Sequence, residues 1–176
     1  VYSPATYWEM GRAFYNAIYK DENLVVIRYP RGRMPENTEY SELNSSDFEV
    51  IGNENAETAI VTYGRLFFNA VEAVKSAEKL DNVKIIKLNR IKPLPEKAVD
   101  AALGCKKVLF FEEGMKNGGI GEKFGCNLLL KGYEGKYRLT AVEDEFVAHA
   151  SVASLMEKYS MSPSAMARIL TEEAAI

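Results

Sequence analysis

From Thr58 onward, short apolar runs alternate with longer segments whose apolar residues recur every three or four positions. The short runs are typical of buried strands, and the longer segments are typical of amphipathic helices. This alternation predicts an α/β fold in three α/β/α layers, with a mostly parallel sheet of about five strands. The predicted strands are residues 48–51, 59–62, 83–88, 108–111 and 137–142. The predicted helices cover 67–80, 95–103, 123–130 and two segments after residue 142, the second opened by Ser162-Pro163.

The first 47 residues have a different organisation. We expect a helix over about the first 20 residues, with Ser3 as its N-cap and Pro4 in its first turn. Residues 24–27, Leu-Val-Val-Ile, form an unbroken apolar run that is typical of a strand buried on both faces. The segment that follows is rich in Asn, Glu and Ser, which indicates a linker. We therefore predict that residues 1–35 are the tail of a preceding domain, that 36–47 are a linker, and that 48–176 form the α/β domain.

The composition argues against several classes of protein. Lys and Arg number 22 against 25 Asp and Glu, and this net charge of −3 argues against binding to nucleic acid. We expect no membrane partner, because no apolar run approaches the roughly 20 residues of a membrane span. Two cysteines without a CxxC pair and a single histidine do not make a Cys/His metal site. We expect Cys105 and Cys126 to be buried thiols in a reducing compartment, the cytoplasm. The chain begins at Val1 rather than Met, so we also expect that further residues precede it.

A glycine-rich segment, residues 117–121 (Asn-Gly-Gly-Ile-Gly), lies between a predicted strand and a predicted helix, where phosphate-binding loops occur. An acidic residue after the next strand, Glu143 or Asp144, completes the outline of a nicotinamide dinucleotide site. However, Glu112 and Glu113 directly precede the loop, and two carboxylates repel a pyrophosphate. We favour a tight turn whose helix packs closely on the sheet or on a neighbouring domain.

The two glutamates and the single histidine are candidates for acid/base chemistry. Adjacent residues of a strand point to opposite faces, so Glu112 and Glu113 do not form a facing pair. We predict instead that one of them is buried and accepts hydrogen bonds from the amides of the glycine-rich loop. His149 has no nucleophile or metal ligand at a recognisable spacing, so we predict a role at the surface or at a helix terminus.

Three arginines, Arg28, Arg31 and Arg33, lie within six residues at the end of the predicted strand 24–27. In open parallel sheets, ligands bind at the carboxyl ends of the strands. The planar guanidinium group can contact two oxygens of one phosphate. The pattern therefore allows an anion site, most of all at Arg28, beside the alternative of a solvated basic turn.

Residues 26–32 (Val-Ile-Arg-Tyr-Pro-Arg-Gly) resemble the R-Y-P-R-G signature of the 1-deoxy-D-xylulose-5-phosphate synthase family, at the end of its pyrimidine-binding domain. Further segments resemble motifs of that family, in the same order along nearly the whole chain. They are Ser3-Pro4 with Glu9, residues 60–64, residues 89–94 (Asn-Arg-Ile-Lys-Pro-Leu), Phe111-Glu112-Glu113 with residues 118–121, and residues 144–149. Two positions depart from the family pattern, since Tyr63 stands in place of a common Phe and Ala150 in place of a frequent Gly.

The resemblance implies a transketolase-like transferase of isoprenoid biosynthesis that uses thiamine diphosphate and Mg²⁺ to condense pyruvate with glyceraldehyde 3-phosphate. Members of that family bind the cofactor through a Gly-Asp-Gly motif in their N-terminal domain, and this chain has no such motif. The resemblance thus places both the cofactor and the catalytic residues outside this chain, which alone would be inactive. The implied partners are the remaining domains of the same enzyme, a second copy in a homodimer, and small-molecule substrates. Arg28 and Arg31 are the residues that it implies for binding the substrate phosphate.

Two alternatives stay open from the sequence. The same domain occurs in transketolases and in the β chains of 2-oxoacid dehydrogenases, which share versions of the Lys-Pro-Leu and Glu-Glu-x-Gly-Gly patterns. The other alternative is a free-standing module that binds a nucleotide or an anion through the glycine-rich loop.

Overall fold

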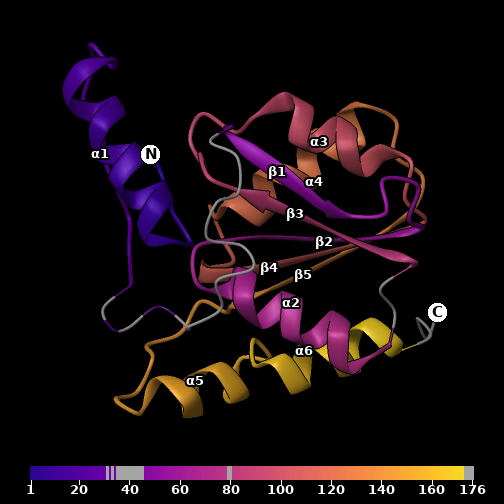
Figure 1. Ribbon diagram of the computed structural model, residues 1–176. Coiled ribbons are helices and arrows are strands. Elements are labelled where there is room, and N and C mark those ends of the chain that lie inside the picture. The colour runs from indigo at the N-terminus through magenta and orange to yellow at the C-terminus, as the bar shows by residue number, and fades with distance from the viewer. Residues whose placement is uncertain (31, 33, 35–45, 79–80, 173–176) are drawn as a thin grey trace.

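The computed structural model describes residues 1–30, 32, 34, 46–78 and 81–172. Figure 1 shows a twisted sheet with helices on both sides and one helix apart from these layers. The helices are α1 (Tyr7–Tyr19), α2 (Leu66–Ser76), α3 (Glu96–Leu103), α4 (Ile120–Leu130), α5 (Val152–Lys158) and α6 (Pro163–Thr171). The strands are β1 (Phe48–Gly52), β2 (Thr58–Tyr63), β3 (Val83–Leu88), β4 (Lys107–Met115) and β5 (Lys136–Val142).

The five strands form one sheet in the order β1-β3-β2-β4-β5. Neighbours are parallel from β3 to β5, whereas the edge strand β1 runs antiparallel to β3. The central strand β2 is buried along its length apart from Thr58, as its mostly apolar sequence predicts. The structure thus confirms the α/β fold with a mostly parallel sheet of five strands.

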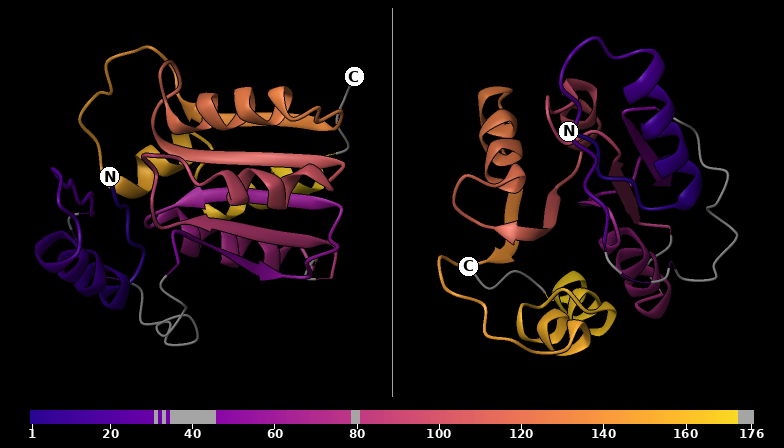
Figure 2. Two further views of the ribbon diagram at one scale, coloured as in Figure 1. Left: turned by 90° about the horizontal axis from the view of Figure 1, so that it is seen from above. Right: turned by 90° about the vertical axis from the view of Figure 1, so that its left-hand side faces the viewer.

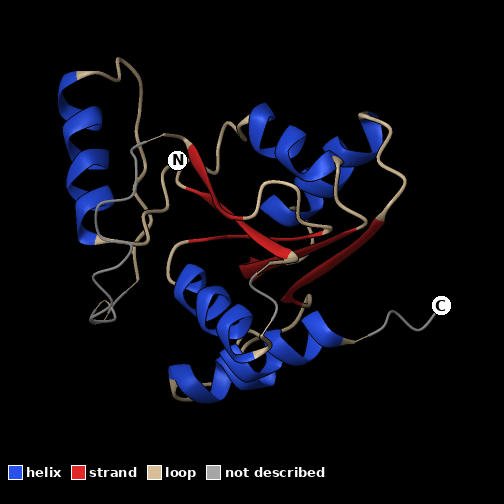
Figure 3. Cartoon of the chain, turned by 45° about the vertical axis from the view of Figure 1, so that its right-hand side comes forward, coloured by secondary structure: helices blue, strands red, loops and turns tan. Residues whose placement is uncertain are grey.

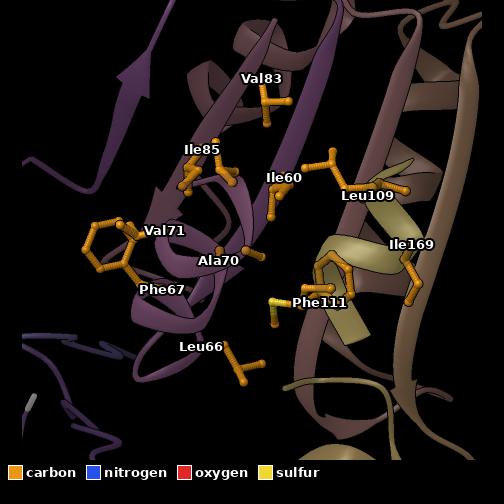
Figure 4. Close-up of a cluster of buried hydrophobic side chains, with 14 of the residues drawn as sticks. Ile60, Leu66, Phe67, Ala70, Val71, Val83, Ile85, Leu109, Phe111 and Ile169 are labelled. Carbon is orange, nitrogen blue, oxygen red and sulfur yellow. The ribbon is translucent and has the colours of Figure 1, made fainter. Parts of the chain in front are cut away.

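Two apolar cores lie on the two faces of the sheet. One lies beneath α2 and α6, and the other lies beneath α3 and α4. Figures 2 and 3 show these helices as outer layers around the strands. In the first core, Ile60 of β2 and Leu109 and Phe111 of β4 meet Phe67 of α2 and Ile169 of α6 (Figure 4). This arrangement confirms the predicted three layers.

The N-terminal helix begins later than the sequence indicates. Its N-cap is Thr6 rather than Ser3, and Thr6 and Glu9 form a capping box. The Thr6 hydroxyl accepts a hydrogen bond from Glu9 N, and the Glu9 carboxylate accepts one from Thr6 N. Ser3 instead continues the extended segment, where its amide donates to Asn89 O. At Thr6 the side chains of Thr6 and Glu9 each accept a hydrogen bond from the other's free amide, and no such pair is available at Ser3. The helix therefore begins after Thr6.

The prediction of a buried strand at residues 24–27 is wrong. Leu24 is 94% exposed, Val26 is 48% exposed, and only Ile27 makes a β-bridge, with Tyr2. An apolar run predicts a core strand, but this segment bridges to Tyr2 and adds no strand at the open edge of β1. Because no strand is added there, residues 24–27 stay at the surface.

Several contacts hold the N-terminal segment to the domain, among them one set around Tyr2 and one around Glu9. Tyr2 lies between two stretches of chain: its amide donates to Val26 O, its carbonyl accepts from Arg28 N, and it forms a second β-bridge with Arg90. The second set is a buried ion cluster, in which the Lys87 ammonium contacts Glu9. The same ammonium lies 3.2 Å from a carboxylate oxygen of Glu49.

The ion cluster is buried between α1 and the strands β1 and β3. Lys87 is fully buried in β3, directly opposite Glu49 of β1, and Glu9 reaches it from α1. Breaking a buried ion pair by removing one partner typically costs about 3–5 kcal/mol, whereas an exposed pair contributes about 0–1 kcal/mol. Losing either partner of the Glu9–Lys87 pair would therefore weaken the attachment of α1 to the sheet.

The opposite face of α1 is exposed and rich in aromatic side chains. The exposed large apolar residues of this helix are Tyr7, Trp8, Phe14, Tyr15, Ile18 and Tyr19. Figure 2 shows α1 beside the sheet, outside the helical layers, in both views. Among the described residues, no helix is both long enough and apolar enough to cross a membrane.

Candidate substrate-anchoring site

The carboxyl ends of β2 and β4 bring several polar side chains together. Tyr63 is the last residue of β2, and Glu112 and Glu113 lie near the end of β4. The two strands are parallel neighbours, so their carboxyl ends meet at one edge of the sheet. The regular pairing of β4 with β5 breaks between Phe111 and Met115, which frees the two glutamates for other contacts.

The Glu112 carboxylate is buried and is held by the start of α4. One oxygen accepts from Ile120 N at 2.9 Å and from the Tyr63 hydroxyl at 2.8 Å. The other accepts from Gly121 N at 2.8 Å. A carboxylate at a helix N-terminus satisfies free amides and opposes the positive end of the helix dipole. This confirms the prediction that one glutamate is buried against the amides of the glycine-rich loop.

The glycines of the loop allow this close approach. A Cβ atom at Gly119 would lie 2.6 Å from the Glu112 carboxylate and 2.5 Å from Met115 O. A Cβ atom at Gly121 would overlap Leu139 and lie 2.9 Å from Phe110 Cδ1. The glycines therefore serve packing against the sheet, and the Glu112 carboxylate occupies the place that a dinucleotide phosphate would take at the start of α4.

Glu113 points away from Glu112, toward the start of α2. Its carboxylate pairs with Arg65 through two contacts, one of them 2.7 Å from Arg65 Nε. The side chains of the pair are about one third exposed, so the contact fixes geometry more than it stabilises the fold. The prediction that the two adjacent glutamates do not face each other is confirmed.

Arg28 joins this cluster from the N-terminal segment. Its Nη1 donates to the Tyr63 hydroxyl at 3.1 Å, and its Nη2 donates to the carbonyl of Glu113. The guanidinium group also lies over the Tyr63 ring, 5.3 Å from the ring centre. Arg28 is exposed, so N–H donors beyond the two that are used remain open to a ligand. It thus lies at the carboxyl edge of the sheet, although it does not end a strand as the sequence suggests.

Tyr63 connects the cation and the anion of this cluster. It is 3% exposed, and burial together with the Glu112 charge raises the pKa of its hydroxyl. The hydroxyl is therefore neutral at physiological pH, donating to Glu112 while accepting from Arg28. Sequence reasoning did not assign Tyr63, Arg65 or Lys87 to any site. The only sequence signal for Lys87 is a lysine inside an apolar strand.

The other candidate residues lie apart from this cluster. His149 and Asp144 are exposed in the segment after β5, and exposed Glu143 pairs with Lys116.

The two cysteines differ in burial. Cys105 is buried, and burial raises the pKa of its thiol, whereas Cys126 is exposed, contrary to the expectation of two buried thiols. Cys126 lies on the outer side of α4, where an apolar residue need not be buried. Arg31 and Arg33 lie outside the described residues.

The described residues do not fit the cofactor that the sequence resemblance implies. They contain no group of three or more His, Cys, Asp or Glu side chains placed to hold a metal ion. The helix N-terminus that follows the glycine-rich loop is taken by Glu112. The described residues at this edge of the sheet instead present the exposed guanidinium group of Arg28.

Comparison with known proteins decides the family. The sequence profile described as "Transketolase, C-terminal domain" matches residues 49–166, about two thirds of the chain. The chain belongs to the transketolase C-terminal domain family. Within this family it is similar to the 1-deoxy-D-xylulose-5-phosphate synthase of Shouchella clausii, with 28% identity over 92% of this chain and 26% of that protein. It is also similar to the synthase of Listeria innocua, with 31% identity over 86% of this chain and 25% of that protein.

Solved structures agree with the family at the level of the fold. A split-gene transketolase, described as an inactive β4 tetramer, has a TM-score of 0.72 at 22% identity and covers 95% of this chain and 55% of its own. A transketolase mutant from Pichia stipitis has a TM-score of 0.71 at 18% identity, over 96% of this chain and 24% of its own. This transketolase C-terminal domain chain spans about a quarter of the length of the curated relatives above.

Proposed function

We propose that this chain is the carboxyl-terminal part of a thiamine diphosphate-dependent synthase of isoprenoid biosynthesis. The enzyme would condense pyruvate with glyceraldehyde 3-phosphate to 1-deoxy-D-xylulose 5-phosphate, with loss of CO₂. Similarity to synthases of that name over most of the chain supports this reaction over others of the family.

The observation that carries the proposal is the exposed Arg28 guanidinium, held at the carboxyl edge of the sheet by Tyr63 and the Glu113 carbonyl. Ligands of open parallel sheets bind at this edge. A guanidinium group offers two parallel N–H donors to phosphate, so Arg28 would anchor the phosphate of glyceraldehyde 3-phosphate. Arg31 is proposed as a second contact to that phosphate.

Thiamine diphosphate and Mg²⁺ would be bound by parts of the enzyme outside this chain, and the chain alone would be inactive. The absence of a Gly-Asp-Gly motif and the lack of a metal cluster among the described residues support this division. The part played by this chain would be to hold the acceptor, while the cofactor supplies the chemistry of bond formation.

The proposed domain organisation follows from the same division. Residues 1–35 would be the tail of a pyrimidine-binding domain, 36–47 a linker, and 48–176 the transketolase-like domain. The exposed aromatic face of α1 supports a covering domain, because apolar side chains gathered on one helix mark an interface. The assembled enzyme would be a homodimer in the cytoplasm.

The alternative is a transketolase or a 2-oxoacid dehydrogenase β chain. The fold does not separate these enzymes, because solved transketolases share it.

The test is the kcat/KM of the complete enzyme carrying Arg28→Ala. Loss of a charge-assisted contact to phosphate typically costs about 2–4 kcal/mol, so we expect a loss of roughly 30- to 1000-fold with glyceraldehyde 3-phosphate. The loss should be much smaller with unphosphorylated glyceraldehyde, because only the phosphate would contact Arg28. Arg28→Lys should restore activity only in part, because an ammonium group lacks the two-pronged geometry.

A matched control is Arg138→Ala. Arg138 is exposed on β5 and pairs with Glu172, away from the carboxyl edge of β2, so its loss should leave kcat/KM unchanged. Equal losses with both acceptors in Arg28→Ala would mean that Arg28 supports the fold or the cofactor, and the phosphate anchor would be abandoned.

A further inference from the structure

A continuous line of hydrogen bonds joins the start of α4 to Arg28. The amides of Ile120 and Gly121 donate to Glu112, Glu112 accepts from Tyr63, and Tyr63 accepts from Arg28. Glu112 and Tyr63 are both 3% exposed, so water competes little for the bond between them.

The direction of each hydrogen bond in this line is determined. A carboxylate accepts hydrogen bonds but cannot donate them, so the Tyr63 hydroxyl is the donor in its hydrogen bond to Glu112. The lone pairs of the hydroxyl then face the remaining neighbour, which is Arg28. A tyrosine in this orientation presents a fixed acceptor to the guanidinium group.

We propose that Tyr63 is a positioning residue, which orients the Arg28 guanidinium group for a phosphate ligand. The inference rests on the proposed function, because it concerns the same arginine. It adds a residue that touches neither the phosphate nor the reacting atoms.

The need for such a residue follows from the exposure of Arg28. A long arginine side chain at the surface samples many rotamers and must lose this freedom when it binds a ligand. The hydroxyl of Tyr63, the carbonyl of Glu113 and the face of the Tyr63 ring restrict the guanidinium group in advance. The carbonyl and the ring remain in Tyr63→Phe, so this variant isolates the contribution of the hydroxyl.

The first measurement is the NMR order parameter of the Arg28 Nε–Hε bond in this chain. We expect a value above about 0.8 in the wild type and below about 0.6 in Tyr63→Phe, the ranges of rigid and flexible groups. Glu112→Gln should have the same effect without removing the tyrosine, because the amide NH₂ group must face one of the donors that the carboxylate accepts.

The control is Tyr137→Phe. Tyr137 is a partly buried tyrosine whose hydroxyl donates to Gly121 O at 2.5 Å and does not contact Arg28. Its loss removes a hydrogen bond at the same loop, so it reproduces any general loosening of that loop. Arg28 should stay rigid in this variant. Equal loosening of Arg28 in Tyr137→Phe and Tyr63→Phe, or no loosening in Tyr63→Phe, would overturn the positioning role.

The second measurement separates this inference from the proposed function. Inorganic phosphate is titrated into each variant while the Arg28 Nε–Hε signal is followed. We expect the Kd to rise about 3- to 10-fold in Tyr63→Phe, the cost of ordering one more side chain on binding. If phosphate does not move the wild-type signal but Tyr63→Phe still loosens Arg28, the phosphate anchor fails and the positioning of Arg28 stands. If phosphate binds both proteins with equal Kd, the positioning role fails and the anchor stands.

Discussion

At the scale of single residues, the glycine-rich loop shows how one motif can serve either binding or packing. Its helix N-terminus has the geometry of an anion site, and the anion is the buried carboxylate of Glu112. An internal carboxylate is tethered and needs no association, so it excludes an external phosphate. The loop therefore stabilises the end of β4 and fixes the acceptor side of the hydrogen-bond line to Arg28.

The packing role predicts that Gly121→Ala lowers the free energy of unfolding. The added methyl group overlaps Leu139 and Phe110, and overpacking of this kind typically costs about 1–3 kcal/mol. Gly104→Ala is the control, because nothing lies within 4 Å of its Cβ position and its φ of −76° suits alanine. Chemical denaturation of the two variants checks this. A Gly121→Ala protein as stable as Gly104→Ala would show that the loop is not tightly packed.

At the scale of elements, β3 is unusual in carrying a fully buried lysine in a strand that is covered on both sides. The Lys87 ammonium group lies beside two carboxylates, Glu9 of α1 and Glu49 of β1. Two acidic groups thus share one cation. Glu49 Oε2 lies near the ammonium but makes no hydrogen bond. Burial first, and the nearby Glu9 charge to a smaller extent, raise the pKa of Glu49 despite the opposing effect of Lys87.

This raised pKa predicts how Glu49 affects stability as the pH changes. A carboxyl group whose folded pKa lies above its unfolded value holds its proton more tightly in the folded state. Its contribution is fully present below the unfolded pKa, near 4.5, and is lost as the pH rises through the folded pKa. The free energy of unfolding of Glu49→Gln, relative to wild type, should therefore increase from pH 4 to pH 7.

The matched control for this measurement has the opposite sign. Glu57 is exposed, and its hydrogen bond to Lys106 lowers its pKa, so its contribution is present above the unfolded pKa and lost as the pH falls. The stability of Glu57→Gln relative to wild type should thus fall, by a small amount, over the same range. Urea unfolding of both variants at several pH values decides this. A flat difference for Glu49→Gln would contradict the account of the ion cluster.

At the scale of the whole molecule, the N-terminal segment belongs to two environments. Its inner side is tied to the sheet by Tyr2 and by Glu9, and its outer side carries the exposed aromatic face of α1.

The proposed division of labour predicts the behaviour of the chain toward the cofactor. Isothermal titration with thiamine diphosphate and Mg²⁺ should show no saturable binding in the micromolar range, because the described residues offer neither a metal cluster nor a free helix N-terminus at the loop. A thermal-shift assay with NAD should likewise show no stabilisation. Saturable binding of thiamine diphosphate would place the cofactor site in this chain and refute the division.

The sequence by itself determined the order and type of the strands and helices from Thr58 onward, because hydrophobic periodicity is a local property of each segment. It also indicated Glu112, the glycine-rich loop and Arg28. Only the tertiary structure decided what these residues contact: Arg28 meets Tyr63 and Glu113 across 35 and 85 residues, and Lys87 meets Glu9 across 78. It also decided that residues 24–27 lie at the surface, because an apolar run becomes a core strand only when it pairs within the sheet and is covered on both faces, whereas the bridge of this segment is to Tyr2.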